Sequence, residues 1–175
     1  MRGRPPVRLA EADRSIDLEA CREAALRLLE RQRRTRSDLE RRLRDKGYAG
    51  ATAAQVLDRL AGVGLVDDVE YARAFMAERR ARRSAGARRI EQELRTRGVS
   101  ADDLAAARLR LDAEQGGMDE VAAARKVIAQ AERRTRGLEP RLRRQRLYAL
   151  LARRGFDGDV IRRALDLPQE AGPEE

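Results

Sequence analysis

Apolar residues recur along this chain at spacings of three and four, the pattern that amphipathic helices produce. In the clearest motif, two apolar residues lie four positions apart, glycine follows after four more, and another apolar residue comes next. The motif occurs three times, as Leu39/Leu43/Gly47/Tyr48, Ile90/Leu94/Gly98/Val99 and Leu147/Leu151/Gly155/Phe156. One copy could arise by chance. Three copies whose glycines are 51 and 57 residues apart, each between two other predicted helices, indicate an internal repeat.

Helix start signals agree with this periodicity. Ser37 and Glu40 match a capping box, and Ser100 with Asp103 forms another. Asp67 is expected to cap the helix that follows it, and Pro140 suits the first turn of a helix. The stretch 60–75 closes one predicted unit and opens the next, so we expect it to set the angle between them.

These patterns predict an all-α fold, an elongated and curved array of three tandem three-helix units. Each unit has about fifty residues, too few to bury a secure core alone, so the units should lean on their neighbours. We divide the chain into a flexible basic arm (1–14), three units (15–66, 67–117 and 118–168) and an acidic, disordered tail (169–175).

Composition restricts the kind of core and the kind of site. Charged residues make up 39% of the 175 residues and aromatic residues 3%, which favours slim helices over one thick core. The aromatic residues all fall at core-like positions of the helical pattern, so no exposed platform for stacking on bases is expected. They are Tyr48, Tyr71, Phe75, Tyr148 and Phe156.

Several classes of chemistry are not expected. The chain has no histidine and a single cysteine, Cys21, so neither an internal disulfide nor a Cys/His zinc site can form. Asp67 and Asp68 are an acidic pair beside a turn, but helix capping explains them more simply than catalysis. No apolar run approaches the ~20 residues that span a bilayer, and no glycine-rich phosphate loop occurs. We expect a monomeric, cytoplasmic, non-enzymatic protein without metal or cofactor.

Positive charge is the main pointer to a partner. The net charge of +9 and isoelectric point of about 10.9 predict attraction to nucleic acid or to an acidic protein surface. The excess gathers in residues 27–46, 79–97 and 133–154, with balances of +5, +6 and +8. One such run is usually a solvated helical face, but recurrence favours a continuous basic strip. The candidate contact residues are Arg79, Arg80, Arg82, Arg83, Arg88 and Arg89 centrally, with Arg143, Arg144, Arg153 and Arg154 in the third unit.

Taken together and in this order, residues 25–48, 60–75, 86–99 and 147–161 resemble the RecX family of regulatory proteins, which control the bacterial recombinase RecA. The resemblance covers roughly residues 18–167. It implies three tandem three-helix units in an elongated crescent, which binds along the helical groove of the RecA–DNA filament and bridges neighbouring protomers. It also implies inhibition of recombinase, ATPase and coprotease activities, and some affinity for DNA.

Two other functions remain open on the sequence alone. One is an independent DNA-binding protein of the helix-turn-helix type, although the helices after Gly47 and Gly155 carry few polar side chains suited to base edges. The other is a scaffold that binds some other acidic protein. Binding to DNA by this chain alone is expected to be weak, sequence-nonspecific and steeply salt-dependent.

Overall fold

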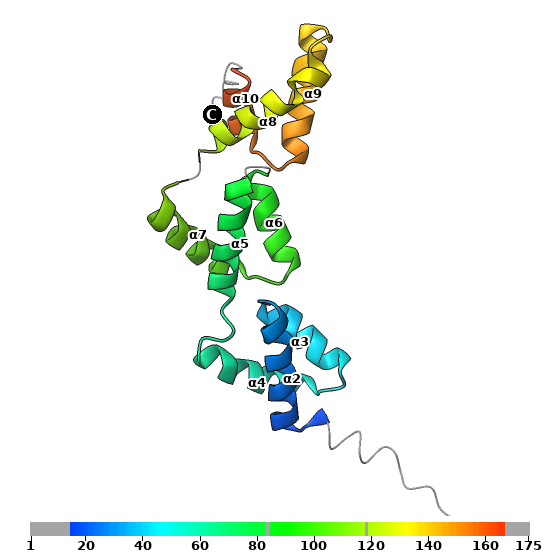
Figure 1. The fold of residues 1–175 in the computed structure, drawn as a ribbon, viewed down its shortest axis with the longest axis vertical. Helices are drawn as coiled ribbons and strands as arrows, with labels where there is room; N and C mark the ends of the chain where they lie inside the picture. The colour runs from blue at the N-terminus through cyan, green and yellow to red at the C-terminus, as the bar shows by residue number, and fades with distance from the viewer. Residues whose placement is uncertain (1–14, 83–84, 118, 167–175) are drawn as a thin grey trace, which may run out of the picture.

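The computed structural model describes residues 15–82, 85–117 and 119–166, and these fold into nine α-helices joined by short connections (Figure 1). The helices form three tandem three-helix units, so the predicted all-α fold and the repeat are confirmed. The predicted arm and tail, 1–14 and 169–175, lie outside the described residues. Unit 1 holds α2 (Leu18–Arg31), α3 (Arg36–Asp45) and α4 (Gly50–Gly62); unit 2 holds α5 (Asp68–Arg82), α6 (Ala87–Thr96) and α7 (Ala101–Gln115); unit 3 holds α8 (Glu120–Thr135), α9 (Pro140–Arg153) and α10 (Gly158–Ala164).

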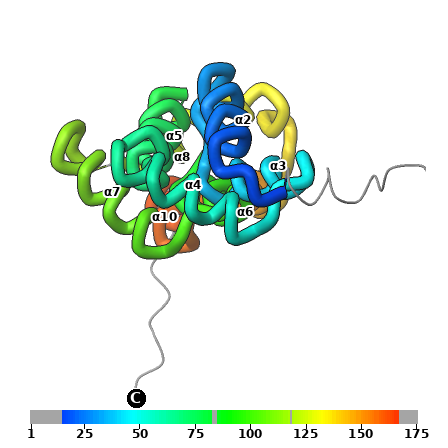
Figure 2. The backbone as a smooth tube through the Cα atoms, turned by 90° about the horizontal axis from the view of Figure 1, so that it is seen from below, coloured from blue at the N-terminus to red at the C-terminus, as the bar shows by residue number. Residues whose placement is uncertain are grey.

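The three units follow one another along the long axis of the molecule (Figure 1). Their second helices, α3, α6 and α9, line one edge of the array, and α4 and α7 lie on the other. Seen along the long axis, the units overlap in projection and α7 projects to one side (Figure 2). The molecule is therefore elongated, with most helix–helix packing inside the units rather than between them.

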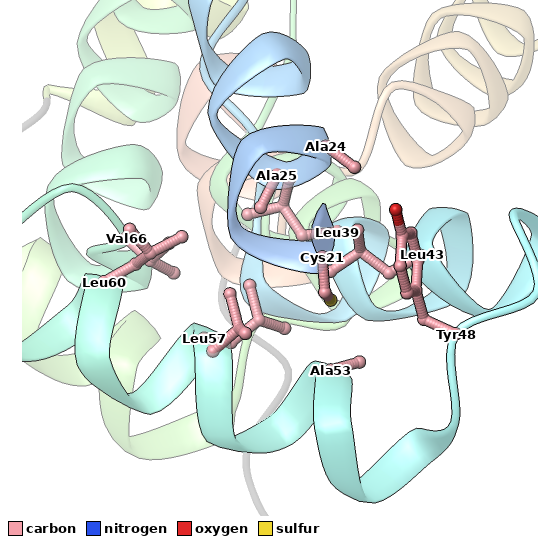
Figure 3. Close-up of a cluster of buried hydrophobic side chains, with 11 residues drawn as sticks. Cys21, Ala24, Ala25, Leu39, Leu43, Tyr48, Ala53, Leu57, Leu60 and Val66 are labelled. Atoms are coloured by element: carbon pink, nitrogen blue, oxygen red, sulfur yellow. The ribbon is translucent and has the colours of Figure 1, made fainter. Parts of the chain in front are cut away.

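Each unit has a small hydrophobic core of its own. In unit 1, Cys21 and Ala25 of α2 meet Leu39 and Leu43 of α3, and Leu57 of α4 closes the cluster (Figure 3). All five side chains are fully buried. The matching apolar residues of the other units are buried in the same way, namely Ile90, Leu94, Leu147 and Leu151. The apolar positions of the repeat are thus the core positions of the units.

A glycine with positive φ ends the second helix of every unit. Gly47, Gly98 and Gly155 have φ values of +92°, +83° and +82°, a conformation that costs a residue with a Cβ roughly 1–2 kcal/mol. The backbone amide of the residue that follows each glycine turns back onto the helix, as in a Schellman motif. These amides donate to a carbonyl of the last helical turn: Tyr48 to Leu43 at 3.1 Å, Val99 to Leu94 at 3.2 Å and Phe156 to Leu151 at 3.2 Å.

Units 1 and 2 are joined at the N-terminus of α3. The Thr35 hydroxyl, at a residue only 1% exposed, donates to the Arg97 carbonyl at 2.7 Å. The Arg36 amide donates to Oδ1 of Asp68 at 2.8 Å. Gly98 lies so close to α3 that a Cβ added to it would overlap the side chain of Ser37. The start of α5 and the end of α6 therefore hold the start of α3.

Units 2 and 3 are joined in the same way at the N-terminus of α6. The Gly86 amide donates to the Arg154 carbonyl at 3.0 Å, and the Ala87 amide donates to Oε1 of Glu120 at 3.2 Å. A Cβ at Gly155 would lie 2.6 Å from the amide nitrogen of Arg89. Both junctions share one design, in which an acidic residue and a helix-ending glycine of one unit receive the helix start of the unit before it.

Adjacent acidic residues have different partners at the first junction. Asp67 caps its own helix, as predicted, accepting from the Glu70 amide at 2.8 Å, whereas Asp68 caps α3 of the preceding unit. Burial raises the pKa of the Asp68 carboxyl, because its charged form loses water that one backbone amide only partly replaces. Burial raises the pKa of Glu120 at the second junction for the same reason. Each junction therefore contains a partly buried carboxyl.

The two ends of the array depart from this design. In unit 1, Asp17 caps α2, but Leu18 stands where units 2 and 3 have the acidic residue that caps a preceding helix. Nothing lies within 4 Å of a Cβ placed on Gly47. In unit 3, α9 begins one turn earlier relative to the repeat than α3 and α6 do, and Glu139 caps it by accepting from two of its own amides. Unit 1 thus lacks the acceptor, and unit 3 caps its own helix start.

Two sequence-based expectations are wrong. The N-cap of α3 is Thr35, whose hydroxyl oxygen accepts from the Asp38 amide at 3.2 Å, so Ser37 lies inside the helix rather than at a capping box. Thr35 can cap α3 and also donate to unit 2, which favours the earlier start. Tyr148 is not a core residue but 39% exposed, because it lies roughly 100° around α9 from the buried Leu147.

Candidate binding surface

The arginines that were predicted to form a binding surface lie on α5, α6 and α9, with Arg154 directly after α9. Arg83 lies outside the described residues. The others differ in their surroundings: two brace unit 2 internally, three lie beside the junction of units 2 and 3, and four follow α9 into unit 3.

Arg79 and Arg80 belong to the internal structure of unit 2. Arg79 lies over the Phe75 ring, 4.9 Å from its centroid, and forms an ion pair with Glu93 of α6 at 2.7 Å. Arg80 pairs with Asp112 of α7 at 2.6 Å, and its side chain is only 15% exposed. Both guanidinium groups therefore hold α5 to its neighbours, and their charge is already compensated.

Arg82, Arg88 and Arg89 are exposed near the junction of units 2 and 3. Arg82 pairs with Glu78 at 2.5 Å, and Arg88, whose side chain is 74% exposed, lies 3.6 Å from Asp157 of unit 3. Arg89 donates from Nη1 to the Arg153 carbonyl at 3.2 Å. Exposed pairs of this kind contribute little stability in water, so these side chains can exchange their present partners for groups on another molecule.

The third-unit candidates follow α9. Arg143 pairs with Glu132 at 3.4 Å. Arg144 and Arg153 are exposed and Arg154 is half-buried, and none of the three side chains forms an ion pair with a described residue. The structure thus separates Arg144, Arg153 and Arg154, which carry uncompensated charge, from the paired arginines of unit 2.

Ion pairing differs between the units as a whole. In the described parts of units 1 and 2, every lysine and arginine forms an ion pair except Arg31, Lys46, Arg59, Arg97 and Arg110. In the described part of unit 3, the only ones that do so are Arg125, Arg143 and Arg162. The uncompensated positive charge therefore gathers in unit 3 rather than evenly along the array.

The junction of units 1 and 2 shows how charge is compensated. A small cavity of about 250 Å³ lies there, and Arg34, Arg41 and Arg42 on its wall all pair with Asp38. Burial alone would raise the pKa of Asp38, but hydrogen bonds from Arg42 and Arg34 outweigh it and lower the pKa. The carboxylate stays charged and holds these three arginines to unit 1.

A groove of about 560 Å³ between α8 and α9 has no such carboxylate. Arg134, Arg146, Arg153 and Arg154 border it, and the rest of its lining is uncharged: Val127, Gln130, Ala131, Thr135, Ala149 and Leu150. We call this the α8–α9 groove. Sequence reasoning placed Arg134 and Arg146 in a basic run without singling them out. Their convergence becomes visible only when the two helices are paired.

Other kinds of chemistry find little support in the described part of the chain. No cluster of three or more His, Cys, Asp or Glu residues is arranged there to hold a metal ion. Cys21 is buried and burial raises the pKa of its thiol, so it is a packing residue rather than a nucleophile. None of the helices in this part is both long and apolar enough to cross a membrane.

Protein-family models match each unit in turn. The model of the first three-helix domain of RecX matches residues 21–60, that of the second matches 67–107, and that of the third matches 119–165. Each match falls on one of the units that the helices form.

Whole-length relatives agree with these matches. The chain is 36% identical over 156 residues to the regulatory protein RecX of Mycobacterium avium, covering 89% of this chain and 87% of the relative. It is 37% identical over 153 residues to that of Streptomyces coelicolor, covering 85% and 79%.

Solved structures share the fold. The crystal structure of RecX from Lactobacillus salivarius matches with a TM-score of 0.75 at 19% identity, covering 85% of this chain and 94% of that one. A second crystal structure of a regulatory protein RecX also has a TM-score of 0.75, at 26% identity, and covers 95% and 82%. Because the three domain models match in tandem on the three observed units, and relatives match along most of both chains, this chain belongs to the RecX family of regulatory proteins.

Proposed function

We propose that this protein is a non-enzymatic regulator of the recombinase RecA. It lies in the helical groove of the RecA–DNA filament, bridges neighbouring protomers and inhibits the recombinase, ATPase and coprotease activities. It acts as a monomer in the cytoplasm, without a cofactor. Its arginines meet acidic groups of the recombinase and phosphates of DNA, and its affinity for DNA alone is weak and sequence-nonspecific.

The observation that carries this proposal is the elongated array, in which hydrogen bonds fix each unit to the next. Three units that each hold the next through buried or partly buried hydrogen bonds form a body of defined shape, suited to a long groove rather than a compact pocket. Exposed arginines on the edge formed by α6 and α9 supply forked donors that bind carboxylate and phosphate in bidentate fashion. Membership of the RecX family supports RecA as the protein that forms the partner filament.

The test is co-sedimentation with preassembled RecA–DNA filaments, with bare DNA as the control, together with DNA-dependent ATP hydrolysis by RecA. Charge reversal to Glu at Arg82, Arg83, Arg88 and Arg89 should release the protein from the filament and relieve inhibition. A matched control reverses four exposed arginines on α2, α4 and α7, namely Arg22, Arg27, Arg59 and Arg110, and should inhibit as the wild type does.

Unchanged inhibition by a folded variant at 82, 83, 88 and 89 would show that this region does not face the filament. Equal sedimentation with filaments and with bare DNA, or a footprint on one defined duplex site at physiological salt, would instead support an independent DNA-binding protein. Capture of a different acidic protein, with RecA filaments left unbound, would support a scaffold.

A further inference from the structure

The third helix of unit 3 is too short to cover the helix pair against which it packs. α10 has 7 residues, whereas α4 and α7 have 13 and 15. The buried apolar residues of α8 accordingly end at Val127, although the helix continues to Thr135. The far ends of α8 and α9 extend beyond α10 (Figure 1), and the α8–α9 groove lies between these two helices.

No carboxylate of the described residues forms an ion pair with the arginines that border the α8–α9 groove. Arg134, Arg146 and Arg153 are exposed and form no ion pair with a described residue. The carboxylates nearest in sequence to these arginines are engaged elsewhere: Glu132 pairs with Arg143, Glu139 caps α9, and Asp157 caps α10 and lies 3.6 Å from Arg88. Hydrogen bonds from two backbone amides lower the pKa of Glu139, which keeps its charge at the helix start.

The lining of the groove indicates which polyanion it fits. An acidic amphipathic peptide would anchor large apolar side chains on large exposed apolar ones, and those of the described chain lie outside the lining. A single nucleic-acid strand would stack its bases on aromatic side chains, and the lining contains none. Small residues such as Ala131 and Ala149 leave room for sugars, while guanidinium groups on both helices reach phosphates.

We propose that the α8–α9 groove binds the sugar–phosphate backbone of double-stranded DNA through Arg134, Arg146 and Arg153. Arg146 and Arg153 lie two turns apart on α9, about 10 Å along the helix, so they contact different phosphates, and Arg134 faces them from α8. The proposal rests on the proposed function for its nucleic-acid contact and assigns that contact to unit 3. Units 1 and 2, whose arginines are mostly paired, meet protein.

The test uses the full-length chain, a labelled mixed-sequence duplex and fluorescence anisotropy over a series of NaCl concentrations. Each phosphate contact contributes about 0.9 to the slope of log K against log salt, so the variant R134Q/R146Q/R153Q should lose about 2 to 3 of that slope. Its affinity in ~0.1 M salt should fall on the order of a hundredfold. The fold should persist, because these side chains are exposed and form no ion pair with a described residue.

The matched control R22Q/R27Q/R44Q removes the same charge from exposed, ion-paired positions of unit 1 and should keep nearly the wild-type slope. Equal losses in both variants would show that only net charge matters and would overturn the proposal. The proposal would also be overturned if a single strand of the same length bound more tightly than the duplex. The same holds if the wild type bound polyglutamate and the groove variant lost that binding as completely as it lost binding to DNA. The anisotropy assay contains no RecA, so its result does not depend on filament binding. If the chain binds DNA through the groove but does not co-sediment with RecA filaments, only the proposed function is overturned.

Discussion

Replacing each helix-ending glycine by alanine should show how much the junctions between units contribute to the free energy of unfolding, apart from the cost of the helix end itself. Gly47, Gly98 and Gly155 share the same position in the repeat and nearly the same φ. Alanine at any of them pays for the left-handed conformation, about 1 kcal/mol, and restricts the unfolded chain to the same extent. Their surroundings differ, since a Cβ meets nothing at Gly47 but would overlap unit 1 at Gly98 and unit 2 at Gly155. Gly47→Ala is therefore an internal control.

The expected difference follows from what must move. To admit a Cβ at Gly98, α3 has to retreat, which breaks the bonds from Thr35 to Arg97 and from Arg36 to Asp68. A buried hydrogen-bonding group left unpaired costs about 1–3 kcal/mol. We expect Gly47→Ala to lower the free energy of unfolding by about 1 kcal/mol and Gly98→Ala by about 3 kcal/mol. Gly155→Ala should resemble Gly98→Ala, since the Arg89 backbone blocks it.

Urea denaturation followed by far-UV circular dichroism measures this difference. Because the units have separate cores, weakening one junction should also broaden the transition or split it, with unit 1 melting apart from units 2 and 3 in Gly98→Ala. Equal losses of stability in Gly47→Ala and Gly98→Ala, with one sharp transition in both, would refute the view that close approach at the glycine holds the units together.

Two further predictions concern the partners of single side chains. Asp68→Ala should lower the free energy of unfolding by about 1–2 kcal/mol, because the Arg36 amide loses its acceptor, whereas Asp68→Asn keeps an acceptor and should equal or exceed wild-type stability at pH 7. The folded-state pKa of Asp68 is raised above 3.8, so between the unfolded and the folded pKa the folded chain holds more protons, and its stability falls as pH rises through that range. Urea titrations from pH 4 to 8 should show this slope in the wild type and a smaller slope in Asp68→Asn, where Glu120 still contributes. Arg80→Ala should destabilise the chain by about 1–3 kcal/mol, because Asp112 loses its close, mostly buried partner and keeps only the 3.9 Å contact with Arg108. The exposed Arg82→Ala should change stability by less than ~0.5 kcal/mol in the same assay.

Local patterns were enough to predict the helices, the repeat and the core. The leucines of the motif are buried and its glycines take positive φ, because periodicity and helix ends depend on neighbours within one turn or two. The same reasoning could not assign Asp68, since a cap on its own helix and a cap on the preceding unit look alike in sequence. The acidic pair that recurs at the start of α5 and of α8, Asp67-Asp68 and Asp119-Glu120, was the available clue.

The binding surface was less accessible to sequence reasoning. Whether an arginine is available depends on carboxylates far along the chain, as with Arg80 and Asp112, which are 32 residues apart. Composition shows an excess of arginine in every unit, but pairing removes most of it from units 1 and 2. The groove between α8 and α9 depends on the shortness of α10. The sequence signals that end a helix do not predict how much of the neighbouring helices it leaves uncovered.

The ends of the array limit how these molecules can assemble on a repetitive lattice. A second copy joining head to tail would need an acidic residue in place of Leu18, and a helix start on α9 that is not already capped by Glu139. Neither condition is met, so the joint that links the units within one molecule cannot link two molecules. Under the proposed function, this joint adds no cooperativity between copies bound side by side on a filament, so we expect occupancy to follow a simple non-cooperative isotherm.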